Sequence, residues 1–249
     1  MSAPEDEEDD ERGDAAGESA RPQLFASLPP GLAAVFDPRR PWDLLGAPLD
    51  ELLAGLPSSR LDTPVPPGVH LLGDRIVIGK GVRLSPGVVL EGPLRLGDDC
   101  EVRPGAYLRG GVWIGAGCVV GANVEVKHAI LLDGAKAPHL NYVGDSILGS
   151  NVNLGAGTIL SNFRHDGSEI EIPDSKDGRA RIATGRRKLG AILGDGVLTG
   201  CNCVLHPGCV VGTGTQIYPG VMLRPGFYPA HHMVKLRQRQ ELVELHRPN

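Results

Sequence analysis

A repeat of six residues runs through the middle of the chain and restricts the folds that it can adopt. Every sixth residue is aliphatic at the ten positions Ile78, Leu84, Leu90, Leu96, Val102, Leu108, Ile114, Val120, Val126 and Leu132. The residue two places before each of them is apolar as well. Six is not a helical period, whereas a strand that alternates its side chains and then turns gives two inward side chains in six residues. The repeat therefore predicts stacked short strands rather than a bundle of helices.

The repeat is interrupted and then resumes, which predicts a solenoid with an insertion. It returns at Leu148, ends again at Leu160, and reappears from Leu193 to Leu223, after a polar stretch at 162–188. Three six-residue units close a coil of about 18 residues, and coils stack about 4.8 Å apart by parallel strand pairing. The repeats together predict about six to seven coils, from which loop 162–188 protrudes.

This pattern resembles the hexapeptide repeat of the left-handed parallel β-helix, and the expected handedness comes from that resemblance. The expected fold class is therefore all-β, with the β-helix at residues 61–228. Residues 25–60 are predicted to form short helices that cap the first coil, the second of them beginning near Asp50. Residues 229–249 are predicted to form an amphipathic C-terminal helix.

The first 24 residues differ from the rest in charge. They contain nine acids and two bases, a net charge of −7, although the whole chain carries only −5. Such a segment has too little apolar surface to fold by itself. Residues 1–24 are therefore predicted to be a disordered acidic tail, which either keeps the protein in solution or binds a basic partner.

Composition excludes several functional classes. Aromatic residues make up 4% of the chain, too few for a platform on which nucleic-acid bases stack. No apolar stretch approaches the roughly 18 residues of a membrane span, and no export signal is visible. The five cysteines lack paired spacing, and Cys201, Cys203 and Cys209 do not match a zinc pattern. We expect a cytoplasmic protein that binds no metal, nucleic acid or membrane.

Three charged residues are spaced by one coil length. Glu91, Arg109 and Lys127 lie 18 residues apart, so we expect them to stack in one column about 5 Å apart. Two cations this close repel each other unless an anion lies between them. That anion is either the Glu91 carboxylate or a bound phosphate, which arginine and lysine both bind well.

Three further features have both a functional and an ordinary interpretation. His139, beside the break in the repeat, is either a general base or a surface residue. Gly155 and Gly157 either offer N–H groups to an oxyanion or simply turn corners. Loop 162–188 is either a solvated loop or a flap facing an anion. Its second half carries the bases Arg179, Arg181, Arg186, Arg187 and Lys188.

Ordered motifs around the break resemble a known family. They are HLNYVGD at residues 139–145, NVNLGAGT at residues 151–158 and KLGAILGDG at residues 188–196. They resemble the acetyltransferase domain of the bifunctional bacterial enzyme that makes UDP-N-acetylglucosamine, and its stand-alone relatives, over about residues 61–235. The resemblance implies an acetyl-CoA-dependent N-acetyltransferase acting on an amino-sugar phosphate such as glucosamine 1-phosphate. It also implies a homotrimer with each site between two subunits.

The resemblance assigns roles to individual residues. His139 matches the general base that deprotonates the sugar amine as it attacks the acetyl thioester, and Glu125 matches a nearby acid of the site. The positions that match ligands of the sugar phosphate are Arg109, Lys127, Tyr142, Asn153 and Lys188. The positions that match contacts to the coenzyme A arm are Ala156, Asn162, Phe163 and Cys201.

The chain also departs from the family pattern. Phe163 stands where the family usually has tyrosine, Cys201 stands where it has serine, and loop 162–188 is longer. The glycine-rich start of a uridyltransferase domain is absent from the sequence. Two alternatives stay open: a non-catalytic trimer that binds a sugar nucleotide, and a uridyltransferase of the UDP-N-acetylglucosamine pyrophosphorylase type.

Overall fold

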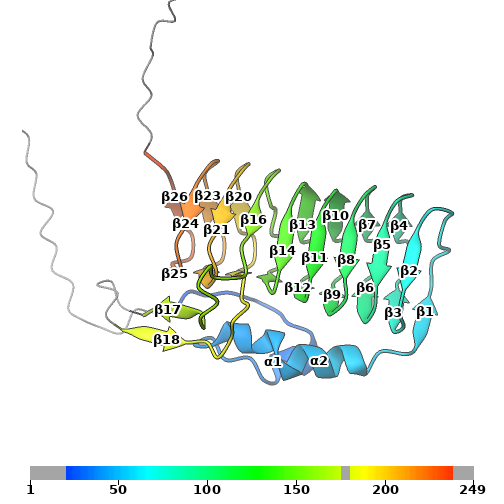
Figure 1. Ribbon diagram of the computed structural model, residues 1–249, viewed down its shortest axis with the longest axis horizontal. Helices are drawn as coiled ribbons and strands as arrows, with labels where there is room; N and C mark the ends of the chain where they lie inside the picture. The colour runs from blue at the N-terminus through cyan, green and yellow to red at the C-terminus, as the bar shows by residue number, and fades with distance from the viewer. Residues whose placement is uncertain (1–20, 175–179, 238–249) are drawn as a thin grey trace, which may run out of the picture.

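The computed structural model describes residues 21–174 and 180–237, and most of them belong to one stack of short parallel strands (Figure 1). The chain winds as a left-handed parallel β-helix, so the predicted fold class is confirmed. Each coil contributes strands to two long sheets, which we call sheet A and sheet B, and to a third face, which we call face C. Within the described ranges, no helix combines the length and apolar character needed to cross a bilayer.

Sheets A and B run the length of the stack. Sheet A consists of β1 (Ser59–Leu61), β3 (Ile76–Ile78), β6 (Leu94–Leu96), β9 (Val112–Ile114), β12 (Ala129–Leu131), β15 (Ile147–Leu148), β19 (Ala191–Leu193), β22 (Cys209–Val211) and β25 (Gly226–Tyr228). Sheet B consists of β2 (His70–Leu72), β5 (Val89–Glu91), β8 (Tyr107–Arg109), β11 (Glu125–Lys127), β14 (Tyr142–Gly144), β16 (Ile159–Leu160), β21 (Val204–Leu205) and β24 (Met222–Leu223).

Face C contains two smaller sheets in line with each other. The first consists of β4 (Arg83–Leu84), β7 (Glu101–Val102), β10 (Val119–Ala122) and β13 (Lys136–His139). The second consists of β20 (Leu198–Thr199), β23 (Gln216–Ile217) and β26 (Met233–Val234). Asn153 links them, because it forms parallel bridges to Lys136 on one side and Leu198 on the other.

The nine strands of sheet A exceed the six to seven coils predicted. The additional strands of sheet A are β1 and β25, which lie outside the regular repeat series. The interior is aliphatic as expected, and Cys100 and Cys118 are both buried in it. Thr158 and Thr199 are also buried there. Their hydroxyl groups form a hydrogen bond, with the two oxygens 2.9 Å apart, so neither is left without a polar partner.

The register of the coil changes one repeat earlier than predicted. Ala129 pairs with Val112, and Leu131 with Ile114, a spacing of 17 residues instead of 18. Ala129 and Leu131 therefore point into the β-helix, whereas Ile130 and Leu132 belong to a second apolar cluster outside it. The predicted tenth repeat, at Ile130 and Leu132, is wrong because the preceding corner is one residue shorter than a regular one.

Helices cover the outer face of sheet A instead of capping the first coil, so the predicted cap is wrong. They are α1 (Pro30–Ala33), the 3₁₀ helix η1 (Pro41–Leu45) and α2 (Ala47–Ala54), which Figure 1 shows alongside the stack. Their buried side chains, including Trp42, Leu45 and Leu49, pack in one cluster with the outward-facing Ile130 and Ile147. Apolar residues that point out of sheet A require such a cover.

The start of α2 and both ends of the described chain also differ from the predictions. Helix α2 begins at Ala47, so Asp50 lies in its first turn instead of preceding it. Leu24 is buried and its carbonyl accepts a hydrogen bond from the Asp195 N–H, so residues 21–24 are not part of a disordered tail. Residues 229–237 contain β26 and no helix. The rest of the predicted acidic tail and C-terminal helix lies outside the described residues.

Removing a side chain from the helical cover should destabilise the whole β-helix. Leu49 is fully buried between α2 and the outer cluster. We expect Leu49→Ala to lower the free energy of unfolding by about 2–5 kcal/mol, the usual cost of a leucine-sized deletion in a core. Val35→Ala, at an exposed position of the same segment, should change it by less than about 0.5 kcal/mol. Urea denaturation followed by circular dichroism measures both; equal effects would contradict a covering role.

Candidate functional site

A pocket of about 340 Å³ opens beside sheet B, near the corners that follow β11 and β14. It is lined by Arg109, Lys127, Tyr142, Asn162, Phe163 and Lys188. All six are residues that the sequence predicts for the site. The pocket therefore brings together four of the five residues expected to bind the sugar phosphate and two of the four expected to contact coenzyme A.

Arg109 and Lys127 lie in the same column, as their spacing predicts. Strands β8 and β11 pair with Tyr107 opposite Glu125 and Leu108 opposite Val126, so Arg109 and Lys127 end neighbouring strands. Glu91 lies opposite Arg109 on the other side. Two successive coils of sheet B thus contribute neighbouring cations, Arg109 and Lys127, to the lining of the pocket.

The expected alternative role of Glu91, to separate the two cations, is wrong. Glu91 accepts a hydrogen bond from the Tyr107 hydroxyl at 2.9 Å and forms no ion pair with Arg109. Arg109 Nη1 instead donates to Glu125 Oε1 at 2.7 Å, and Lys127 Nζ lies 3.3 Å from Asp145 Oδ2. Each cation therefore has its own carboxylate.

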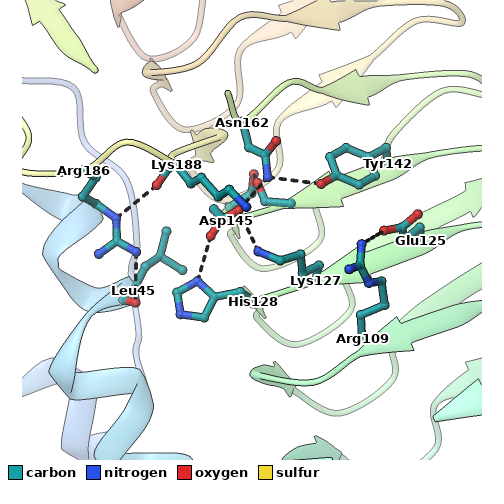
Figure 2. Close-up of polar contacts among 12 residues, drawn as sticks. Leu45, Arg109, Glu125, Lys127, His128, Tyr142, Asp145, Asn162, Arg186 and Lys188 are labelled. Atoms are coloured by element: carbon teal, nitrogen blue, oxygen red, sulfur yellow. Dashed lines mark hydrogen bonds and ion pairs between the residues drawn. The ribbon is translucent and has the colours of Figure 1, made fainter. Parts of the chain in front are cut away.

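Asp145 lies at the centre of these polar contacts (Figure 2). Its side chain is 5% exposed. Oδ2 accepts a hydrogen bond from Asn162 Nδ2 at 2.6 Å and faces Lys127, while Oδ1 lies 3.1 Å from His128 Nδ1. Burial alone would raise the pKa of this carboxyl group, but the contact with His128, the charge of Lys127 and the bond from Asn162 together lower it. Asp145 is therefore ionised in the folded protein at neutral pH.

Asn162 links Asp145 to the next lining residue. The same Nδ2 that donates to Asp145 also donates to the Tyr142 hydroxyl oxygen at 3.1 Å. Burial is the main cause that raises the pKa of Tyr142, so this phenol remains protonated. A Cβ at Gly144 would lie 2.5 Å from the Tyr142 hydroxyl oxygen and 2.7 Å from Asn162 Nδ2, so only glycine allows these groups their positions.

His139 lies outside the pocket. It ends β13 on face C, is exposed, and precedes the corner residue Leu140, whose φ is 52°. Two residues separate it from Tyr142, so the two Cα atoms, three chain steps apart, lie at most about 11 Å from each other. The candidate base and the cationic pocket thus belong to neighbouring edges of the coil.

Ala156 and Cys201 lie at the same corner as His139, one and two coils further along. The Gly157 N–H donates to the His139 carbonyl at 3.1 Å, and the Asn202 N–H donates to the Ala156 carbonyl at 2.8 Å. Asn153 lies on face C, and Glu125 contacts Arg109 beside the pocket. The predicted site residues therefore form two groups, one around the pocket beside sheet B and one on face C and its corner with sheet B.

The N–H groups of Gly155 and Gly157 are not available to an oxyanion. Gly155 donates to Thr199, and Gly157 donates to the carbonyl of His139 in the coil before it. The interpretation of these glycines as an oxyanion site is wrong, because parallel pairing of the coils already uses both N–H groups. They turn corners, and Gly157 does so with a φ of 73°.

Loop 162–188 folds against the coils instead of being a solvated loop. It contains the antiparallel hairpin of β17 (Glu171–Pro173) and β18 (Arg181–Ala183), whose Ile172 is buried in the outer cluster. Arg179 lies outside the described residues. Among the four other bases, Lys188 alone lines the pocket; Arg186 and Arg187 donate to backbone carbonyls and Arg181 lies 3.7 Å from Glu171. Of the described bases of this loop, Lys188 is therefore the one placed at the pocket.

Sequence reasoning missed His128 and Asp145. Asp145 lies 18 residues after Lys127, although sheet B pairs Lys127 with Gly144 and so places Asp145 at the corner one residue beyond the column. Extending the 18-residue series by one step in the sequence would nevertheless have found it. His128 had a weaker signal, its position directly after Lys127. In the part of the chain that the structure describes, no three His, Cys, Asp or Glu side chains are grouped closely enough to hold a metal ion.

Comparisons with known proteins agree with this architecture. The family profile described as "GMPPB C-terminal domain" matches residues 90–241. A bifunctional sugar-1-phosphate nucleotidylyltransferase/acetyltransferase of Sulfurisphaera tokodaii is 46% identical over 104 residues, which cover 42% of this chain and 25% of that protein. The bifunctional protein GlmU of Xanthomonas campestris pv. campestris is 33% identical over 188 residues, which cover 69% of this chain and 36% of the relative.

The matches with these two relatives thus span about a quarter and about a third of their lengths. Among solved structures, the Arabidopsis UDP-N-acetylglucosamine acyltransferase is similar with a TM-score of 0.38 and 14% identity. That likeness covers 71% of this chain and 69% of the other.

The ionisation of Asp145 should contribute to stability in a pH-dependent way. Its folded-state pKa lies below the ordinary value of 3.8, so the contribution is present above about pH 4 and is lost as the pH falls through the folded-state value. We expect Asp145→Asn to lose less stability than the natural protein between pH 5 and about pH 3. Urea denaturation across this range tests it, with Asp50→Asn, at an exposed position of α2, as the control. Identical pH profiles for the natural protein and Asp145→Asn would contradict the lowered pKa.

Proposed function

Because this chain belongs to the GMPPB C-terminal domain family, we propose that it is an N-acetyltransferase that moves an acetyl group from acetyl-CoA to an amino-sugar phosphate. Glucosamine 1-phosphate is the expected acceptor. The observation that carries the proposal is the cationic pocket beside sheet B together with an exposed histidine on the neighbouring edge. Of the two relatives, one is named a bifunctional sugar-1-phosphate nucleotidylyltransferase/acetyltransferase and the other bifunctional protein GlmU, and the acetyltransferase half of the first name favours the same chemistry.

The charges of the pocket suit a phosphate monoester. Arg109, Lys127 and Lys188 line it, and the two carboxylates paired with these cations, Glu125 and Asp145, leave one positive charge in excess. Within the described residues, Lys188 forms no ion pair. A guanidinium binds two phosphate oxygens at once, and an ammonium adds a point charge. Tyr142 presents a hydroxyl that suits a sugar hydroxyl. Asn162, which the resemblance assigns to the coenzyme A arm, lies in the same pocket next to Tyr142, and we propose that its amide also faces the sugar.

The position of His139 defines the direction in which the sugar extends. With its phosphate in the pocket, a sugar lying over Tyr142 carries its amine toward the corner that holds His139. The imidazole accepts a proton as the amine nitrogen bonds to the thioester carbonyl carbon. Cleavage of the C–S bond then releases the coenzyme A thiolate, which takes up that proton. The products are the N-acetyl sugar phosphate and free coenzyme A.

The separation of the two groups supports the expected homotrimer. The pocket faces one edge of the coil, while His139, Ala156 and Cys201 lie at the next corner. A ligand enclosed by both groups needs a second wall, which a neighbouring subunit would provide. The proposed site therefore lies between two subunits, with coenzyme A along the corner of Ala156 and Cys201.

A free-thiol assay tests the proposed activity. Purified protein is incubated with acetyl-CoA and a panel of amino-sugar phosphates, and thiol release is followed. Release with glucosamine 1-phosphate is the expected result. Coenzyme A binding without thiol release on any acceptor would favour a non-catalytic sugar-nucleotide-binding trimer. Consumption of UTP with N-acetylglucosamine 1-phosphate would favour the uridyltransferase alternative.

His139→Ala should reduce kcat by about 10²–10⁴, because removal of a positioned general base commonly has this effect. The KM for the sugar phosphate should change little, since His139 lies outside the pocket. His165→Ala, at an exposed position of the insertion, is the matched control. A loss of less than a few-fold in His139→Ala would assign the base to another residue.

Arg109→Ala should act mainly on KM for the sugar phosphate. A hydrogen bond to a charged group contributes about 1.5–3 kcal/mol, which corresponds to a rise of roughly 10- to 150-fold. The control is Arg83→Ala, which removes an arginine paired with Glu101 on face C. Steady-state kinetics at varied sugar phosphate measures both variants, and an unchanged KM would remove Arg109 from the site.

A further inference from the structure

A buried carboxylate lies beside a pocket that we propose to bind an anion, and its charge alone opposes that role. The side chain of Asp145 is 5% exposed, whereas that of Glu125, the other carboxylate of the pocket, is 36% exposed. Burying a carboxylate is unfavourable unless it is paired and hydrogen-bonded. Asp145 has such partners, because Lys127, Asn162 and His128 surround its carboxylate.

The backbone of Asp145 is fixed from both sides of its coil. Its N–H donates to the Lys127 carbonyl at 3.0 Å, and its carbonyl accepts from the Gly190 N–H at 2.8 Å. His128 and Asp145 occupy the two short corners, with φ values of 47° and 46°. The imidazole of His128 then lies against Oδ1, so that Oδ2 faces Lys127 and Asn162.

We propose that Asp145 is the positioning residue of the pocket, which orients Lys127 and Asn162 directly and Tyr142 through Asn162, and that His128 holds it in place. The inference rests on the proposed function for the identity of the ligand. It adds two residues to the site for which no role was predicted.

The contacts of Asp145 determine which hydrogen-bonding groups the pocket presents. Both N–H bonds of the Asn162 amide are used, one toward Asp145 and one toward Tyr142. Among the described residues nothing donates to Asn162 Oδ1, so this oxygen remains an acceptor for a sugar hydroxyl. The Tyr142 hydroxyl accepts from Asn162 and keeps its own proton to donate. Without Asp145 the amide is free to turn, and this pattern is lost.

The same contact orders Lys127. A lysine side chain loses up to about 2 kcal/mol of rotamer freedom when it is fixed. Asp145 fixes it before the ligand arrives and uses only one of the three N–H groups of the ammonium, which leaves two for a phosphate. Orientation before binding thus offsets the repulsion that the carboxylate charge exerts on the ligand.

Two variants of Asp145 separate orientation from charge. Asp145→Ala should weaken binding of glucosamine 1-phosphate at least about tenfold, measured by calorimetry without acetyl-CoA. Asp145→Asn should bind within about threefold of the natural protein, because its amide oxygen accepts from Lys127 and Asn162 while its N–H₂ takes the place of Oδ1 beside His128. Equal losses in both variants, or no loss in Asp145→Ala, would overturn the proposal.

A double-mutant cycle tests whether Asp145 acts through Lys127. If it does, Asp145→Ala should weaken binding much less in a Lys127→Ala background than in the natural protein. Fully additive effects would contradict the inference. The matched control is Asp133→Ala, which removes a carboxylate that accepts from the Ala116 N–H at 2.7 Å at another corner. It should alter the unfolding temperature but not the binding.

Gly144→Ala provides a test in which Asp145 stays in place. The added Cβ would displace Tyr142 and Asn162, so glucosamine 1-phosphate should bind at least about tenfold more weakly. Inorganic phosphate, which needs only the cations, should bind as before. Unchanged glucosamine 1-phosphate binding in this variant would contradict the role of the Asn162–Tyr142 pair.

These titrations also separate this inference from the proposed function. If the variants bind as predicted but no thiol is released, the positioning role of Asp145 stands and the proposed acetyltransferase activity fails. If the natural protein bound neither glucosamine 1-phosphate nor inorganic phosphate, both the positioning role and the proposed function would fail.

Discussion

Parallel hydrogen bonding between successive coils is the interaction on which the rest of the structure depends. Through most of the stack it places a residue above the one that lies 17 or 18 positions earlier, as Ala129 above Val112 and Tyr107 above Val89. Arg109 and Lys127 become neighbours for this reason alone. Across the insertion it pairs residues 45 positions apart, as Ile192 with Ile147. The same bonding also occupies the backbone N–H of Gly157, which leaves the chemistry of the site to side chains.

The two short corners affect both an apolar cluster and a polar contact. By removing one residue, the first corner directs Ile130 and Leu132 outward, and the helices α1, η1 and α2 bury them. The same corner ends with His128, and the second ends with Asp145, which brings these side chains into contact beside the pocket. The two short corners thus account for the outward position of Ile130 and Leu132 and for the polar contact beside the pocket.

The insertion at 162–188 completes the pocket from outside the repeat. Phe163 and Lys188, at its two ends, form an antiparallel bridge and both line the cavity. The hairpin between them packs on the cover of sheet A through Ile172. The bridge to Phe163 therefore fixes the backbone of Lys188, while its side chain is exposed, as is that of His139 at its corner of the β-helix.

The sequence by itself determined the β-helix and the column of Arg109 and Lys127, because a six-residue period leaves few ways to bury two side chains per repeat. It did not reveal the short corner, since Ile130 and Leu132 are as apolar as the residues that replace them inside. Only the tertiary structure decided which carboxylate meets which cation, because coil spacing fixes Cα positions while packing and burial select the rotamers. The tertiary structure was also needed to place His139 on a different edge from the pocket, because the six-residue repeat does not show at which corner of the coil a residue lies.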